Sequence, residues 1–139
     1  MINACVFQGN EVDIIVNGDD IGITNNQFFS TKTSAIKTDI VATFGLNIQS
    51  NNFLNQSLVG SALHPCVQIN SNLTASMISN NVFRNGTSGM SSHGILFLDT
   101  ITATEVMALG NIARGMKTGG YQLKTAVIRV NNIGTIVDV

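Results

Sequence analysis

The sequence predicts an all-β protein in which the chain winds into a coil of stacked parallel strands. Three observations predict this fold: a motif that recurs every 21 to 30 residues, short apolar runs between its copies, and polarity supplied by Asn and Gly instead of charge. Periods of about 20 to 50 residues are typical of solenoids and related arrays. The chain has 139 residues, so we expect a single domain, 1–139, of about five stacked levels.

The recurring motif is I-x-x-N-x-F-x-[NS]. Its clearest copies begin at Ile23, Ile48 and Ile78 and read ITNNQFFS, IQSNNFLN and ISNNVFRN. A copy at the start of the chain, INACVFQG, has Ile2 and Phe7 in register. The spacing of the copies varies, which predicts loops of different lengths joining levels of similar shape.

A decayed copy, ALGNIARG, places Asn111 in the Asn position and Ala113 in the aromatic position. The surrounding segment, 102–117, has enough helical periodicity to pass for a helix, and helix stays the alternative there. The register of the repeat favours a strand and a turn.

Short β-rich runs lie between the motif copies, and several alternate apolar with polar residues, as half-buried strands do. These runs are Val12–Val16, Ser34–Lys37, Cys66–Ile69, Gly94–Leu98 and Thr125–Val130. Each predicts one further strand per level of the coil.

Stacking explains why the motif repeats Asn and Phe. Neighbouring strands lie about 4.8 Å apart, so equivalent residues of successive levels touch. Phe28, Phe53 and Phe83 should therefore form one file of rings, and Asn26, Asn51 and Asn81 a ladder of side-chain amides. Like charges stacked at this distance repel, which fits a charged content of only 11%.

At these motif residues the chain resembles the single-stranded right-handed β-helix of the pectate-lyase superfamily, over nearly its whole length. The superfamily includes pectate lyases, polygalacturonases, epimerases and the trimeric tailspikes of bacteriophages. The variable levels and the many Asn, Ser and Thr residues resemble the tailspikes most. The resemblance implies a C-terminal fragment of a longer chain, in which 116–139 caps the stack or contributes to a trimer.

Composition argues against several other classes. The net charge is −1, with 7 basic and 8 acidic residues, so we expect no nucleic-acid partner, which would need clustered cations. No apolar run approaches the roughly 20 residues of a membrane span, and no signal peptide is recognisable. Without a Cys/His cluster of ligand spacing, we expect neither a metal site nor a cofactor.

Four acidic residues are the candidates for catalysis. Asp19 and Asp20, in the sequence NGDD, resemble the paired aspartates of polygalacturonases, and paired carboxylates can cleave glycosides as acid and base. Asp99 and Glu105 follow a later strand and could face a groove. The competing interpretation is that NGDD forms a tight turn whose aspartates accept hydrogen bonds from backbone N–H groups.

Three further residues are candidates for carbohydrate binding. Tyr121, beside two glycines, is the best aromatic candidate for stacking on a sugar, because the Phe residues are needed for the internal file. Arg84 could contact a sugar or uronate, and His93 could act near neutral pH. For each of them the alternative is an ordinary surface or turn residue.

Two functions follow from the resemblance. In the first, the chain is a structural and receptor-binding module of a phage tail, trimeric and in contact with bacterial surface polysaccharide. In the second, it carries part of a polysaccharide hydrolase or lyase site. The sequence favours the first, because no carboxylate pair falls at matching register in adjacent levels.

Overall fold

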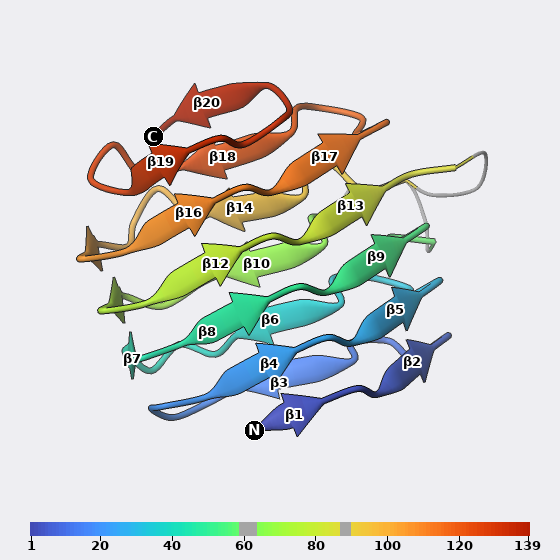
Figure 1. The fold of residues 1–139 in the computed structure, drawn as a ribbon, viewed down its shortest axis with the longest axis horizontal. Coiled ribbons are helices and arrows are strands. Elements are labelled where there is room, and N and C mark those ends of the chain that lie inside the picture. The colour runs from blue at the N-terminus through green and yellow to red at the C-terminus, as the bar shows by residue number, and fades with distance from the viewer. Residues whose placement is uncertain (59–63, 87–89) are drawn as a thin grey trace.

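The computed structural model describes residues 1–58, 64–86 and 90–139. Within these ranges the regular secondary structure consists of β-strands, without a helix. The strands form four sheets, and each pairing between them is parallel. Figure 1 shows the levels stacked from the N-terminal strands at the bottom to the C-terminal strands at the top. The predicted all-β class with parallel strands is therefore confirmed.

The motif copies form two of the sheets. Sheet I has six strands: β1 (Ile2–Asn3), β4 (Gly22–Thr24), β8 (Asn47–Gln49), β12 (Met77–Ser79), β16 (Met107–Leu109) and β19 (Ile128–Val130). Sheet II has five strands: β2 (Val6–Gln8), β5 (Gln27–Phe29), β9 (Asn52–Leu54), β13 (Val82–Arg84) and β17 (Ile112–Arg114). Each copy thus supplies one strand to sheet I, turns a corner, and supplies one strand to sheet II.

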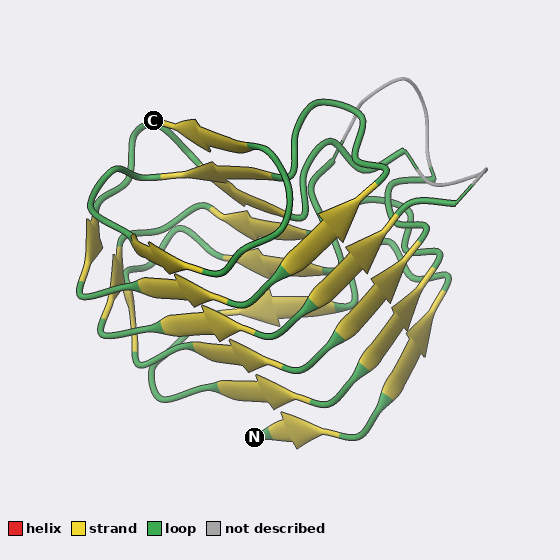
Figure 2. Ribbon diagram, turned by 45° about the horizontal axis from the view of Figure 1, so that its top comes forward, coloured by secondary structure: helices red, strands yellow, loops and turns green. Residues whose placement is uncertain are grey.

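The segments between the motifs form the other two sheets. Sheet III has six strands: β3 (Ile14–Val16), β6 (Ile36–Thr38), β10 (Val67–Ile69), β14 (Ile95–Phe97), β18 (Tyr121–Leu123) and β20 (Ile136–Asp138). Sheet IV has three strands: β7 (Thr43–Phe44), β11 (Leu73–Thr74) and β15 (Ala103–Thr104). The chain visits the sheets in the order I, II, III, IV in the levels that contain β7, β11 and β15, whereas β3 and β18 are followed directly by a strand of sheet I. Figure 2 shows the resulting stacks of yellow arrows.

Two of the sequence predictions change at this level of detail. The segment 102–117 contains β15, β16 and β17, so the helical alternative is wrong. The predicted strand Thr125–Val130 is also displaced: only Ile128–Val130 is extended, it belongs to sheet I, and β18 takes the expected place in sheet III. A Gly-Gly pair directly before β18 made that segment look like a turn.

The file of Phe rings forms as predicted. Phe28 and Phe53 stack with 4.7 Å between ring centroids, and Phe53 and Phe83 with 4.8 Å. Phe7 lies on Phe28 at 5.0 Å, and all these pairs come from residues directly opposite in sheet II. Ala113 pairs with Phe83, as the decayed motif copy predicted.

The Asn ladder also forms and is fully hydrogen-bonded. Each motif Asn donates from Nδ2 to the Oδ1 of the next Asn and to the carbonyl oxygen of a residue in sheet I. The Oδ1 atom of each Asn accepts a hydrogen bond from a backbone N–H one level below. In every Asn of the ladder except Asn26, this Oδ1 also accepts from the Nδ2 of the Asn one level below. The ladder comprises Asn26, Asn51, Asn81, Asn111 and Asn132. Such saturation lets amides be buried without loss of stability.

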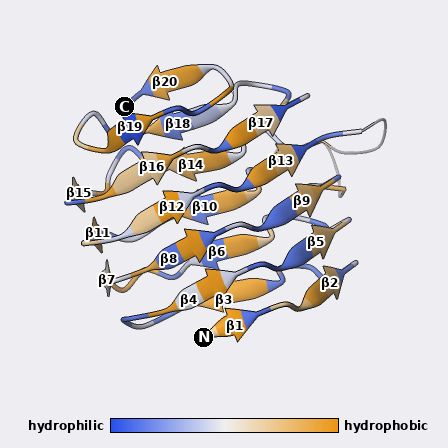
Figure 3. Ribbon diagram, in the orientation of Figure 1, coloured by the Kyte–Doolittle hydropathy of each residue, from blue (hydrophilic) through white to orange (hydrophobic). Residues whose placement is uncertain are grey.

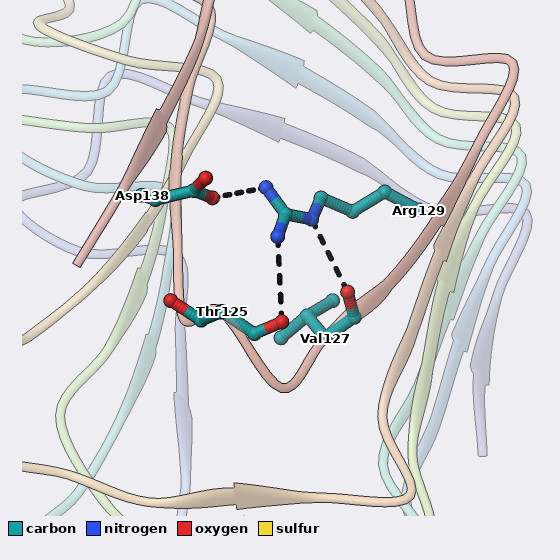
Figure 4. A network of polar contacts seen from close by, with 4 residues as sticks. All are labelled: Thr125, Val127, Arg129 and Asp138. Carbon is teal, nitrogen blue, oxygen red and sulfur yellow. Dashed lines mark hydrogen bonds and ion pairs between the residues drawn. The ribbon is translucent and has the colours of Figure 1, made fainter.

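The last level differs from the others in its inward-facing residue. Arg129 is the register partner of Ala108 and stands in the column that Ile23, Ile48 and Ile78 fill below. Its guanidinium donates to the carbonyl oxygens of Thr125 and Val127 and pairs with Asp138 (Figure 4). These contacts bridge β19 and β20 at the C-terminal end, while the role of 116–139 as a cap or trimer contact stays a prediction.

Candidate binding groove

The outer face of sheet I provides the candidate site. Along each three-residue strand of sheet I the middle side chain points inward and its two neighbours point outward, as on β8, where Figure 3 shows hydrophobic orange beside hydrophilic blue. On β4 and β8 the outward residues are small or polar, whereas on β16 and β19 they are mostly large and apolar. The outer face therefore changes character from the N-terminal to the C-terminal levels.

An open groove of about 470 Å³ crosses this face where the two characters meet. Its volume falls within the roughly 300–1,000 Å³ of small-molecule sites. Four strands and the corners after them contribute its lining: Gln49, Met77, Ser79, Asn80, Leu109, Gly110, Val130 and Asn131. The lining combines apolar side chains with amides and a hydroxyl and contains no ionisable side chain.

The corner between sheets I and II forms one wall of the groove. Its residues adopt left-handed backbone conformations, with φ of 55° at Asn80, 61° at Gly110 and 54° at Asn131. Asn and Gly tolerate this region best, which explains why the corner positions carry them. A Cβ atom on Gly110 would lie 2.6 Å from Oδ1 of Asn80, so the glycine also makes room for that amide.

Ser79 is the polar residue at the floor of the groove. It lies between Gln49 and Leu109 in one outward column, and only 2% of its surface is exposed. Its hydroxyl has no hydrogen-bond partner within the described chain. An unsatisfied buried hydroxyl costs stability, on the order of 1–3 kcal/mol, and a ligand that bonds to it removes this cost.

The four acidic candidates lie at two corners of the coil, outside the lining of the groove. Asp19 accepts a hydrogen bond at 2.9 Å from the N–H of Phe44, as the turn interpretation of NGDD predicted. Asp20 and Glu105 stand at the same corner, both with left-handed φ, separated by the levels of Gly45 and Ala75. Three strand spacings place them roughly 14 Å apart, beyond the ~5–9.5 Å at which two carboxylates cleave a glycosidic bond.

Asp99 lies in a turn at a different corner, between sheets III and IV. Its Oδ1 accepts from Nε2 of Gln122 at 3.2 Å, and its carbonyl oxygen accepts from Nζ of Lys124 at 2.7 Å. The structure therefore brings neither Asp99 nor the other three acids into the groove over sheet I.

Tyr121 is fully buried, contrary to the expectation of an exposed ring. It packs edge-on against Phe83, with centroids 6.4 Å apart, and donates its hydroxyl to the carbonyl oxygen of Ile133 at 3.1 Å. Burial raises the pKa of this hydroxyl. Gly134 leaves room for the ring, since a Cβ there would lie 3.1 Å from it. Tyr121 thus fills the interior that the file of Phe rings leaves open beyond Phe83, and offers no stacking face to a sugar.

His93 and Arg84 lie outside the groove as well. His93 lies two residues before β14 and is buried, with 4% of its surface exposed, and burial lowers the pKa of its imidazole. Its Nδ1 has no partner in the described part of the protein. Arg84 is exposed on the outer face of sheet II, where its register partners are Leu54 and Arg114.

Neither a metal site nor a membrane span is apparent in what the structure describes. Across residues 1–58, 64–86 and 90–139, no three His, Cys, Asp or Glu side chains are grouped so that they could hold a metal ion. The same ranges contain no helix with the length and apolar character needed to cross a bilayer.

Comparison with known proteins gives no assignment: the chain matches no protein-family model, no curated protein and no solved structure. The groove therefore has to be interpreted from its own chemistry.

Sequence reasoning missed the groove although it found the levels that build it. All the groove residues except Met77 stand at the two positions after the inward residue of a strand in sheet I. At the first of these positions Gln49, Ser79 and Leu109 have nothing in common. The signal that could have found them is variation at one fixed position of a regular repeat.

Proposed function

We propose that this chain is part of a phage tailspike-like protein and recognises polysaccharide on the surface of a host bacterium. In this proposal the coil is a right-handed β-helix of about five rungs, related to the pectate-lyase superfamily, and it stands on the virion tail. It acts as a structural, receptor-binding and trimerising module. The observation that carries the proposal is the groove over sheet I, with several hydrogen-bonding side chains and no carboxylate.

The stacked interior supports the structural part of the proposal. A file of aromatic rings and a saturated amide ladder give a stiff rod whose outer face can vary without disturbing the core. Uncharged polar groups on a rigid surface suit sugar hydroxyls, which both donate and accept hydrogen bonds.

Exposed apolar side chains support the trimer. Ile40, Val41 and Phe44 lie close together in the chain with 86%, 53% and 51% of their surfaces exposed. Concentrated exposed apolar surface marks an interaction site. We expect light scattering at micromolar concentration to give three times the monomer mass, and Ile40→Asp to lower it. A monomeric wild-type chain would contradict this part of the proposal.

The enzymatic alternative, a polysaccharide hydrolase or lyase, is weaker because none of its candidate acids lines the groove. Immobilised protein should bind a purified bacterial surface polysaccharide in a panel of such polymers, without releasing reducing ends or unsaturated products. Release of either product, abolished by Asp19→Asn or Asp20→Asn, would favour the enzyme. Absence of binding across the panel would contradict both functions.

A further inference from the structure

We propose that the groove over sheet I binds an uncharged glycan through the N-acetyl group of one of its sugars, and that Ser79 determines this specificity. The inference rests on the proposed function and names the ligand class of the same face. It is carried by the absence of charge in the lining and by two unpartnered polar groups that flank Met77: Ser79 in the lining, and Asn47 just beside it as the register partner of Met77.

The lining excludes charged sugars. None of its eight residues can ionise. A uronate, a sialate or a protonated amino sugar would lose water in the groove without gaining an opposite charge, and burying an unpaired charge is costly. The groove therefore suits a neutral ligand.

Three neighbouring side chains on the outer face match the three parts of an acetamide. Ser79 has a hydroxyl and Asn47 an Oδ1 atom, and each of these buried groups lacks a partner among the described residues. Met77 stands between them, as the register partner of Asn47 and two residues before Ser79 on β12. Ordinary strand geometry puts Met77 about 4.8 Å from Asn47 along the sheet and about 6.7 Å from Ser79 along the strand.

An acetamide presents one donor, one acceptor and one methyl group. Because a trans amide points its N–H and its C=O in opposite directions, it needs an acceptor on one side and a donor on the other. Asn47 Oδ1 accepts from the N–H, the Ser79 hydroxyl donates to the C=O, and Met77 with Leu109 contacts the methyl group. One sugar hydroxyl in the same place cannot reach both groups, because these strand spacings put them roughly 8 Å apart, and it leaves the apolar contact unmade.

Entry requires only side-chain movement. The unpartnered Ser79 and Asn47 atoms are covered by their neighbours, and Gln49 and Met77 on the same face have flexible unbranched side chains. Turning one of them aside exposes the floor of the groove. Bonding two orphaned polar groups offsets the cost of ordering these side chains.

Titration calorimetry with matched trisaccharides tests the inference. Chitotriose carries an acetamide on every sugar, cellotriose has hydroxyls in their place, a glucosamine trimer has free amines, and a galacturonate trimer is acidic. We expect chitotriose to bind at least about tenfold more tightly than each of the other three, which corresponds to one hydrogen bond to an otherwise unsatisfied group plus the methyl contact.

Ser79→Ala supplies the site-specific test. The hydroxyl has no protein partner, so its removal should leave the melting temperature unchanged or higher. The variant should bind chitotriose about fivefold to tenfold more weakly and should lose most of the preference over cellotriose. Ser92→Ala is the matched control, because the Ser92 hydroxyl is also buried and unpartnered but lies outside the groove. It should bind as the wild type does.

The outcomes separate the two proposals. Equal affinity for chitotriose and cellotriose, or an unchanged affinity in Ser79→Ala, would overturn the inference. If a bacterial polysaccharide still binds in either case, the proposed function stands. Preferential binding of the galacturonate trimer would overturn the charge argument and would indicate binding at Arg84 and Arg114, which are register partners on sheet II.

Discussion

The inward and outward side chains of sheet I follow opposite rules. Inward, successive levels repeat one residue type, as Ile23, Ile48 and Ile78 do. Outward, on the same strands, the order Thr24, Gln49, Ser79, Leu109, Val130 repeats nothing. Stacking at about 4.8 Å demands that buried neighbours match, and it makes no such demand on exposed ones. The interior therefore specifies the coil, and the exterior is free to carry recognition.

The largest effect is expected where the interior rule is strictest. Asn81→Ala removes the Oδ1 atom that accepts hydrogen bonds from the backbone N–H and the Nδ2 of Asn51. It also removes the Nδ2 atom that donates to the carbonyl oxygen of Ile48 and to Oδ1 of Asn111. Four buried polar groups lose a bond, so the free energy of unfolding should fall by at least about 4 kcal/mol. Chemical denaturation measures it. The control is Asn52→Ala, one residue past the ladder on β9, which should cost less than about 0.5 kcal/mol.

The C-terminal exception to the rule should matter next. Arg129→Met keeps a long side chain in the inward column but loses the bonds to Thr125, Val127 and Asp138. We expect a loss of about 2 kcal/mol, because three charge-assisted bonds disappear at a partly exposed site. A variant as stable as the wild type would mean that this network does not hold β19 and β20 together.

A smaller loss should follow from replacing one ring of the file. Phe53→Leu keeps an apolar residue between Phe28 and Phe83 but removes both stacking contacts. The melting temperature should drop by an amount that corresponds to about 1–2 kcal/mol. Leu54→Ala changes the outward residue directly after Phe53 and should lower the melting temperature less than Phe53→Leu does. The reverse ranking would contradict the assignment of these two faces.

The weakest effect is the pH dependence contributed by His93. Burial lowers the pKa of its imidazole from the ordinary 6.5, so the unfolded state binds protons more readily than the folded state does. This stability contribution is complete above pH 6.5 and is lost as the pH falls through 6.5 toward the folded pKa. His93→Gln should therefore show a shallower loss of stability between pH 7 and 5 than the wild type. If the free energy of unfolding falls equally with pH in both proteins, His93 does not contribute this pH dependence.

The interior could be predicted from sequence because stacking turns physical contact into sequence identity. Phe28, Phe53 and Phe83 recur at one position of the motif, and this recurrence predicts the register of sheet II. The same logic failed where the repeat decays. In the final level Asn132 continues the ladder, but Arg129 and Gly134 replace the Ile and Phe that would have marked the copy.

The groove could not be predicted because its outward side chains differ from level to level, so no residue type marks them. They come from four levels, and their only common property is a position on the outer face. Tyr121 shows the converse difficulty: Gly119 and Gly120 suggested an exposed turn, whereas Ala113 and Gly134 leave the interior space that the ring occupies. The residues that decide its burial lie in other levels of the coil.

Mapping a ligand onto the labelled chain by NMR tests the division between interior and exterior most directly. On titration of ¹⁵N-labelled protein with a bound bacterial polysaccharide, the amides of Ser79, Asn80 and Gly110 should shift. Those of the interior residues Phe53 and Asn51, and of the corner residues Asp19 and Asp20, should stay in place. Shifts confined to the corner of Asp19, Asp20 and Glu105 would contradict recognition by the outer face of sheet I.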